Sequence, residues 1–369
     1  MTTASQLYAL SLAQCADLIT AIGPDRTVVV QGDMGSAKTS GLRKLLSESH
    51  PNHTYVEFDC TNKDIQDLSV PKFMQRVGDM ISDYVEFVPN AELGAHLGKP
   101  IIINFDEFLK SSEPVKKGVR RVMLERMVNG IKLPEGSIVY GTSNLGSEGV
   151  GDSLQAHQRN AIIVVRMRKA TNMEWVEWGI NNGIHTSVLA FAKDNPQIFQ
   201  SFEEVKNPDD NPDIFHPMDK GRLAFVTGRS LETASRILHK RNVLDDQTIM
   251  ASLIGSIGPN AAQNLMAVEA LSDQLPSRKS IIDDPDDAKV PSNAAALCMV
   301  VFRALATMDR EFVDPWMRYF NRMPAEAQSM FANGVRAKSY TATKKTIVMT
   351  NSRFTKWCGD NGFLFTADQ

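Results

Sequence analysis

The chain has 369 residues, of which 43% are hydrophobic and 22% are charged. This length is enough for two or three domains, and the composition is that of an ordinary globular protein with a sizeable core. Forty basic and 43 acidic residues give a formal net charge of -3, so nucleic-acid binding is not supported by charge, although net charge says nothing about a local patch.

The cysteines are too far apart for a CxxC pair and too few to stabilise a chain of this length through disulfide bonds. We therefore expect reduced thiols and a cytoplasmic protein. No early segment resembles a secretory signal, and no apolar run approaches the ~20 residues of a membrane span. The seven histidines include no HExxH pattern, and none is assigned as a metal ligand. The cysteines are Cys15, Cys60, Cys298 and Cys358.

Residues 6–23 carry apolar side chains at mostly helical spacing and end at Gly23 and Pro24, which predicts a lid or packing helix. The next stretch, TVVVQGDMGSAKTS from Thr27 to Ser40, predicts a buried strand, a loop and a helix from about Lys38 to Ser47.

This stretch is close to G-x-x-x-x-G-K-[ST], in which small residues let backbone N–H groups surround a phosphate at a helix N-terminus. Lys38 would contact the β- and γ-phosphates, and the Thr39 hydroxyl would bind Mg²⁺. The alternative is a small-residue turn with a surface lysine. The predicted nucleotide-binding residues are Gly32, Asp33, Met34, Gly35, Ser36, Ala37, Lys38, Thr39 and Ser40.

Ala37 departs from the pattern because it replaces the glycine directly before the lysine. Alanine lacks the freedom of glycine at positive φ. We therefore expect Ala37 to have helical φ and ψ already, at the start of the helix.

Residues 55–58 predict a second strand, and residues 81–88 (ISDYVEFV) alternate enough to predict a strand or hairpin insert near 81–90. The run from Ile101 to Glu107 (IIINFDE) has four apolar residues in the five positions before its two acids, and a mainly apolar run is typical of a buried parallel strand. Ligands of open α/β sheets lie at such strand ends, so Asp106 would bind Mg²⁺ and Glu107 would polarise the attacking water. The alternative for this pair is a helix cap.

Residues 113–129 predict an amphipathic helix that stops at Gly130. We expect its basic face to be solvated or to lie between subunits, and DNA contact is the less favoured alternative. Residues 137–141 predict another strand, which places Asn144 at the same sheet edge. There its amide could hold the attacking water. The alternative is a turn, because asparagine after a strand commonly forms one. The basic face carries Lys116, Lys117, Arg120, Arg121 and Arg126.

Residues 154–159 predict a short helix and residues 161–165 the last buried strand. Arg159, between them, could donate to the γ-phosphate of a neighbouring subunit, or could simply cap a helix C-terminus. Beyond residue 170 the pattern is helical, with Ser230 as the N-cap of a helix through about His239 and an acidic loop at 281–291. The predicted division is an α/β domain at 1–170 and helical lid and C-terminal regions at 171–369.

The ordered set GDMGSAKT, IIINFDE, GTSN, an arginine before the last strand, and GRS in the helical part resembles the AAA+ ATPases, and among them the MoxR group. The resemblance implies an α/β P-loop AAA+ core followed by an all-α lid. It also implies that the Walker A, Walker B, sensor 1, arginine finger and sensor 2 elements fall on Gly32–Thr39, Asp106 with Glu107, Asn144, Arg159 and Arg229.

The resemblance further implies ATP and Mg²⁺ as cofactors, with ATP between protomers of a homo-oligomer, usually a hexamer. MoxR-type members often act with a von Willebrand factor A domain protein as chaperone-like remodellers. Similar chains occur in bacteriophage genomes, which would place the protein in the host cytoplasm. The insert near 81–90 corresponds to the hairpin that MoxR-type proteins carry in their second helix.

Three other functions stay open from the residues alone. One is a nucleotide-gated scaffold with little hydrolysis, and another is a DNA-linked motor. The third is a small-molecule kinase or GTPase, which the absence of a convincing N-K-x-D motif and the long helical region disfavour.

Overall fold

The computed structural model describes residues 8–74, 84–145, 160–219, 221–272 and 275–362. The chain divides into two compact units. The first comprises Met1–Lys169 with His216–Met218, and the second comprises Ala170–Phe215 with Asp219–Gln369.

The first unit is built on a five-stranded sheet with the strand order β2-β5-β8-β1-β9, and every neighbouring pair is parallel. Because all five strands run in one direction, their carboxyl ends meet at the same edge of the sheet. The strands are β1 (Val28–Gly32), β2 (Thr54–Asp59), β5 (Ile101–Asp106), β8 (Ile138–Asn144) and β9 (Ile163–Arg166).

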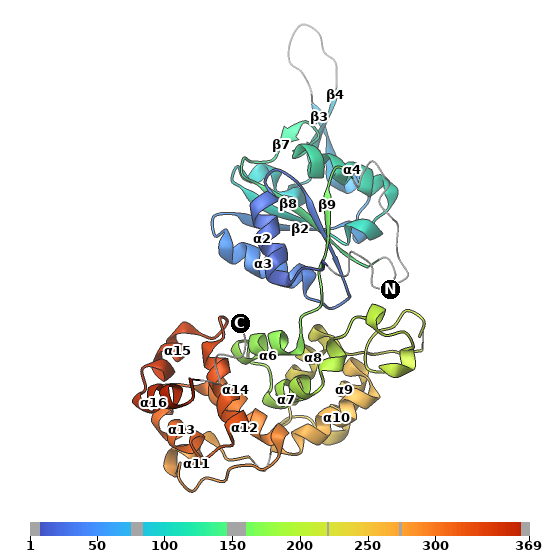
Figure 1. The fold of residues 1–369 in the computed structure, drawn as a ribbon. Coiled ribbons are helices and arrows are strands. Elements are labelled where there is room, and N and C mark those ends of the chain that lie inside the picture. Colours follow the sequence, from blue (N-terminus) through green and yellow to red (C-terminus); the bar gives the residue numbers. More distant parts are fainter. Residues whose placement is uncertain (1–7, 75–83, 146–159, 220, 273–274, 363–369) are drawn as a thin grey trace. The chain divides into compact units, whose positions relative to one another are not determined.

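The apolar strands supply both faces of this sheet because side chains alternate along a strand. Val29 and Ile103 pack in one core cluster with α4, whereas Val28 and Ile102 pack in another with α2 and α3. The sheet is therefore a central layer between helices (Figure 1). The helices are α2 (Leu12–Ile22), α3 (Lys38–Ser49) and α4 (Glu113–Glu125).

The first helix begins later than the sequence predicted. Ser11 caps α2 by accepting from the N–H of Gln14 while the Gln14 side chain accepts from the N–H of Ser11, and this reciprocal capping box fixes the start. Leu10 lies outside the helix and bridges to Met167.

The predicted helix at 113–129 is too long, because α4 ends at Glu125. Asn129 and Gly130 have φ values of 46° and 84° and connect two short antiparallel strands, β6 (Met127–Val128) and β7 (Ile131–Lys132). Asn-Gly with positive φ at both positions is the preferred two-residue hairpin turn. The hairpin turn therefore ends the helix earlier than the apolar spacing of its residues predicts.

The expected basic face of α4 also needs correction. The Lys116 side chain is only 3% exposed and lies 3.3 Å from Glu113. Arg126 turns inward and donates to the carbonyl of Gly23 and to the hydroxyl of Thr27, each at 2.8 Å, and burial lowers its pKa to about 10. Fewer charges therefore face solvent than helical spacing indicated.

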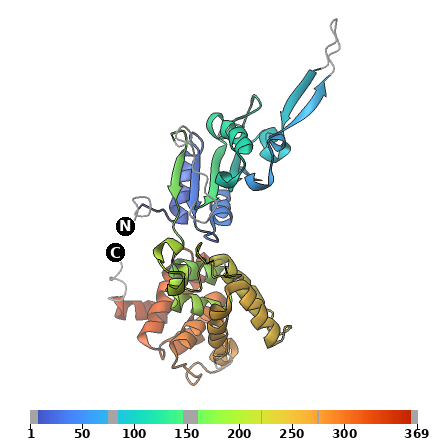
Figure 2. The same ribbon diagram turned by 90° about the vertical axis from the view of Figure 1, so that its right-hand side faces the viewer.

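An antiparallel ribbon of β3 (Ser69–Met74) and β4 (Tyr84–Pro89) projects from the first unit (Figure 2). The sequence predicted a strand or hairpin near 81–90, of which residues 81–83 lie outside the described residues. It did not predict β3, whose Pro71 weakens the strand pattern.

The described residues of the second unit form helices joined by loops and turns, with no strand among them. An α/β sheet followed by an all-α region confirms the predicted fold class. Among the described residues, no helix combines the length and apolar character needed to cross a bilayer. The helices are α6 (Asn172–Asn181), α7 (Thr186–Asp194), α8 (Gly228–Leu238), α9 (Asp246–Ile257), α10 (Pro259–Glu269), α11 (Arg278–Asp283), α12 (Ala294–Thr307), α13 (Val313–Phe320), α14 (Ala325–Arg336), α15 (Ala342–Met349) and α16 (Ser352–Asp360).

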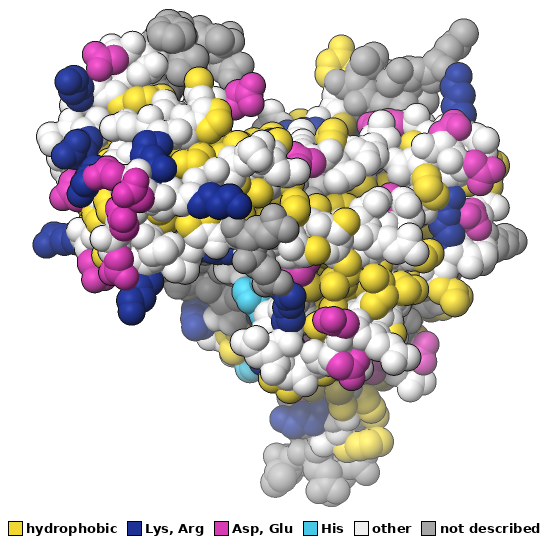
Figure 3. Space-filling model, turned by 90° about the horizontal axis from the view of Figure 1, so that it is seen from below, with side chains coloured by type: hydrophobic (Ala, Val, Ile, Leu, Met, Phe, Trp, Pro, Cys, Tyr) yellow, Lys and Arg dark blue, Asp and Glu magenta, His cyan; other side chains and the backbone are white. Residues whose placement is uncertain are grey.

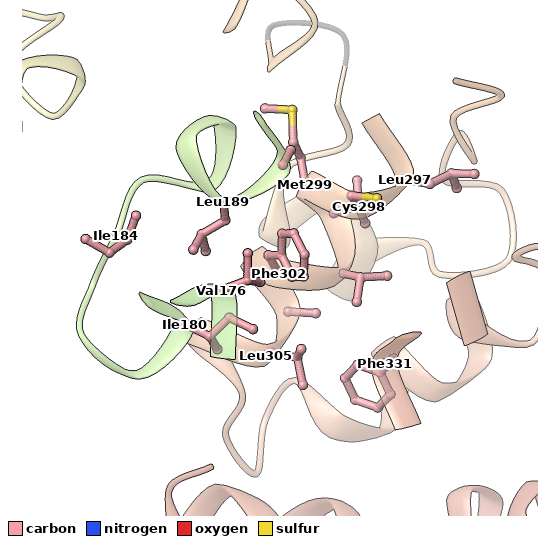
Figure 4. Packing of buried hydrophobic residues seen from close by; sticks show 14 of the residues in the cluster. Val176, Ile180, Ile184, Leu189, Leu297, Cys298, Met299, Phe302, Leu305 and Phe331 are labelled. Carbon is pink, nitrogen blue, oxygen red and sulfur yellow. The ribbon is translucent and has the colours of Figure 1, made fainter. Parts of the chain in front are cut away.

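Helix α12 is the centre of this unit. Its sequence, AAALCMVVFRALAT, is apolar on nearly all sides, which is typical of a helix surrounded by others. Met299, Phe302 and Leu305 of α12 lie among side chains from α6, α7 and α14, including Leu189 and Phe331 (Figure 4).

Two predicted boundaries in this unit are wrong. Helix α8 begins at Gly228, and its N-cap is Thr227, whose hydroxyl accepts from the N–H of Ser230; Ser230 is the third helical residue and completes a capping box. The first residues of the predicted acidic loop at 281–291 belong to α11.

A buried polar network also lies in this unit. The carboxylate of Glu269 accepts from Arg241 at 2.9 Å and from the Ser187 hydroxyl. His185 Nδ1 is 3.6 Å from the same carboxylate. Burial lowers the pKa of His185; Glu269 opposes this change, while the nearby cations Arg303 and Arg241 and the His239 ring add to it.

We predict that this histidine makes the protein less stable in acid. A pKa lower in the folded than in the unfolded state means that the unfolded chain binds the proton more tightly. The contribution of neutral His185 to the free energy of unfolding is present above the unfolded pKa of about 6.5. It is lost as the pH falls below that value. His185→Asn keeps a capping acceptor for the N–H of Ser187 and removes the titration, so its Tm should fall less than that of the native protein between about pH 7.5 and 5.5.

The control is His96→Asn, at an exposed position of the first unit. Equal acid sensitivity of the native protein and His185→Asn would contradict the prediction.

Candidate functional site

The carboxyl ends of β1, β5 and β8 bring the predicted site residues of the first unit together. Register pairs Gly32 with Asn144 and Phe105 with Gly141. The P-loop stretch, the acidic pair after β5 and the polar end of β8 are therefore neighbours although more than a hundred residues separate the first from the last.

The loop between β1 and α3 requires small residues. A Cβ on Gly32 would lie 3.0 Å from the Met167 carbonyl oxygen and 3.4 Å from the Lys38 Cδ, and Gly35 has a φ of 67°. Ser36 closes the turn by donating its hydroxyl to the Asp33 carbonyl at 2.7 Å.

Ala37 does not have the helical φ and ψ that the sequence analysis required. It is the N-cap of α3 in the left-handed region, with φ 64° and ψ 22°. A Cβ in this region costs roughly 1–2 kcal/mol, so Ala37 holds a conformation in which glycine is favoured. The loop therefore has a left-handed residue at the position where alanine replaces the last glycine of the pattern.

The ammonium group of Lys38 lies at the centre of the site. The residue is 6% exposed, and Nζ donates to the carbonyls of Gly32 and Asp33 at 2.8 and 2.7 Å and to Asn144 Oδ1 at 2.8 Å. Because an ammonium only donates, the contact also fixes which end of the Asn144 amide faces Lys38. A buried cation is therefore held by oxygen dipoles beside a helix N-terminus, an arrangement that suits an anion.

The hydroxyl of Thr39 and the carboxylate of Asp106 meet at the same edge. Thr39 Oγ1 donates to Asp106 Oδ1 at 2.9 Å, and the Thr142 hydroxyl donates to the same oxygen. A hydroxyl and a carboxylate are hard oxygen donors of the kind that Mg²⁺ prefers, and Mg²⁺ commonly takes one or two protein ligands together with substrate phosphates. The donor set of Thr39 and Asp106 thus fits Mg²⁺. No cluster of three or more His, Cys, Asp or Glu in the described part of the chain offers an all-protein metal site.

Glu107 lies directly after β5 with a φ of 49°. Its Oε2 accepts from the N–H of Asn144 at 3.4 Å and lies 3.3 Å from Lys110 Nζ. The carboxylate is therefore at the same edge as Lys38 and Asp106.

The remaining predicted residues are placed as follows. Met34 lies in the loop and Ser40 in the first turn of α3. Arg159 lies outside the described residues. Arg229 is exposed in the first turn of α8, in the second unit.

Sequence analysis missed two side chains of this edge. Lys110 pairs with Glu107, and the amide oxygen of Asn104 is 3.2 Å from the Thr142 hydroxyl. The signal available for Asn104 was a polar residue inside an otherwise apolar strand, which is unusual in a sheet buried on both faces.

The four cysteines are unpaired. Burial raises the pKa of Cys15 to about 12 and also raises the pKa of Cys60, so these thiols are poor nucleophiles. They take no part in the site.

Fold and site together define a protein with a P-loop-like strand, loop and helix at the edge of a parallel α/β sheet. No family model matches the chain, and no curated protein matches it.

The solved structures to which the chain is similar include three bacterial proteins. They are NtrX of Brucella abortus in complex with ADP (13% identity, 87% of this chain and 65% of that one, TM-score 0.37), a RuvB mutant of Thermotoga maritima (14%, 83% and 85%, 0.38) and a candidate ATPase of Cytophaga hutchinsonii (13%, 92% and 87%, 0.33). TM-scores this low carry no functional argument.

We predict that Ala37→Gly stabilises the protein, by about 1 kcal/mol, because glycine adopts φ 64° without the Cβ clash. The measurement is the free energy of unfolding from denaturant titration. Ala21→Gly, at an exposed position inside α2, is the matched control and should destabilise by roughly 0.5–1 kcal/mol. The same sign for both substitutions would contradict the strained conformation of Ala37.

Proposed function

We propose that the protein is an ATP-binding and ATP-hydrolysing AAA+ protein of the MoxR type. The observation that carries this proposal is the convergence of Lys38, the Thr39–Asp106 pair and Asn144 at one sheet edge. The order and identity of these residues are those of the motifs on which the family resemblance rests.

Phosphate binding is assigned to the loop from Gly32 to Ser40. The loop N–H groups and the N-terminus of α3 attract the phosphates, and Lys38 exchanges its bonds to Gly32, Asp33 and Asn144 for bonds to phosphate oxygens. Thr39 and Asp106 would hold Mg²⁺. When bound, this ion neutralises charge on the β- and γ-phosphates.

Water activation is assigned to Glu107 and Asn144. Glu107 accepts a proton from the attacking water, and the Asn144 side chain orients that water. The contact between Glu107 and the N–H of Asn144 keeps the two groups adjacent. Lys110, 3.3 Å from Glu107, competes for the carboxylate that must accept the proton.

Two arginines complete the proposed mechanism. Arg159 of a neighbouring protomer stabilises negative charge in the transition state, and Arg229 of the helical unit senses the γ-phosphate and couples hydrolysis to motion. The protein then acts as a ring, usually a hexamer, that remodels a partner in a chaperone-like manner, with a von Willebrand factor A domain protein as one candidate. If the chain is phage-encoded, this happens in the host cytoplasm.

We predict that Glu107→Gln binds ATP as the native protein does and lowers turnover by a factor of roughly 10² or more, because the amide cannot accept the water proton. Equilibrium binding of a fluorescent ATP analogue and steady-state phosphate release measure the two effects. Glu135→Gln, at an exposed position, is the matched control. Unchanged turnover would remove Glu107 from the mechanism.

A second prediction tests the ring. Arg159→Ala should bind ATP normally and lose turnover by roughly 10³ or more, as an arginine finger does. Arg159→Ala and Glu107→Gln subunits should regain activity when mixed, since an Arg159→Ala site keeps its own Glu107 and borrows Arg159 from its neighbour. Light scattering with and without ATP measures assembly.

The control for the ring test is Arg353→Ala, at an exposed position of α16. A monomer under all conditions, or mixed subunits without recovered activity, would demote Arg159 to a surface residue.

The second candidate function is a nucleotide-gated scaffold that barely hydrolyses ATP. The ion pair between Lys110 and Glu107 favours it, because the lysine occupies the carboxylate oxygen that the attacking water would have to reach. Phosphate release with and without candidate partner proteins separates the two functions. On the face drawn in Figure 3, basic and acidic side chains are interspersed, so that face gives no support to a DNA-linked motor.

A further inference from the structure

Asp106 is held by a hydroxyl from a neighbouring strand. Its Oδ1 accepts from Thr39 at 2.9 Å and from the hydroxyl of Thr142. Thr142 is fully buried, and its hydroxyl also lies 3.2 Å from Asn104 Oδ1.

The sheet register explains why these residues meet. Strands β5 and β8 pair Asn104 with Tyr140 and Phe105 with Gly141, so the next pair along is Asp106 and Thr142. Any slip of the register by one residue would turn Thr142 to the other face.

The Thr142 hydroxyl has one proton and two acceptors within reach. A carboxylate is the stronger acceptor, so the proton goes to Asp106 in a charge-assisted hydrogen bond. A threonine in a strand has a stiff χ1, which restricts where its hydroxyl can point. Thr142 is therefore a rigid donor that sets the orientation of a carboxylate at the end of its strand.

We propose that Thr142 is a positioning residue for the Mg²⁺ site, an inference that rests on the proposed function. Its hydroxyl fixes the Asp106 carboxylate so that Asp106 and Thr39 serve the same ion. Groups that orient metal ligands from outside the coordination sphere commonly change metal affinity by about 10- to 100-fold when removed. Thr142 does not touch the nucleotide in this assignment.

The experiment compares Thr142→Val, which keeps the branched shape and removes the donor, with Thr142→Ser, which keeps the hydroxyl. Binding of a fluorescent ATP analogue is measured in EDTA and across a Mg²⁺ titration. Thr142→Val should raise the half-saturating Mg²⁺ concentration by ~10-fold or more and leave binding in EDTA unchanged. Thr142→Ser should behave like the native protein.

The control is Ser143→Ala. This neighbouring hydroxyl is buried and has no hydrogen-bond partner among the described residues, so its loss should not change the Mg²⁺ dependence. Thr142→Ala repeats the test if valine prevents folding, which the Tm reports.

The outcomes separate the two levels of the proposal. A native protein that binds no nucleotide in either condition would overturn the proposed function itself. A native protein whose binding tightens with Mg²⁺, together with an unchanged Mg²⁺ dependence in Thr142→Val, would overturn the role of Thr142 alone. Equal loss of binding with EDTA and with Mg²⁺ would also overturn that role, because it would show a purely structural hydroxyl.

Discussion

The buried ammonium group of Lys38 is the interaction on which the rest of the site depends. Taking a cation out of water is expensive unless oxygen atoms surround it. Here those oxygens come from the end of β1, from the following loop and from Asn144 at the end of β8. The group can be buried because two parallel strands end side by side. The register of the sheet therefore places the oxygen atoms that stabilise the charge of Lys38.

Local strain accompanies this constraint. Ala37 and Glu107, which flank the site on two different loops, both have positive φ. For residues other than glycine this conformation is uncommon, and such residues cluster at functional sites when the surrounding structure holds them in place. Ala37 is the N-cap of α3, so the helix begins with Lys38 and Thr39. Glu107 directs its carboxylate toward the N–H of Asn144.

The helical unit follows a different principle. Its core surrounds α12, and a single carboxylate, Glu269, gathers hydroxyl and guanidinium donors from separate segments. A buried carboxylate with several hydrogen-bond donors favours one packing of the helices, although it need not add net stability. Arg229, by contrast, is exposed, and no side-chain contact among the described residues of its unit fixes a role for it.

The sequence by itself determined the class of the fold and the residue types at the carboxyl edge of the sheet. Three valines before a small-residue loop, four apolar residues before Asp106, and Lys38 with Thr39 at a helix start are local patterns, and local patterns set strands, turns and helix starts. Tertiary structure alone decided the φ of Ala37, the early end of α4 and the inward path of Arg126. It also decided that Thr142 faces Asp106, because cross-strand contacts depend on a register that joins residues far apart in the chain.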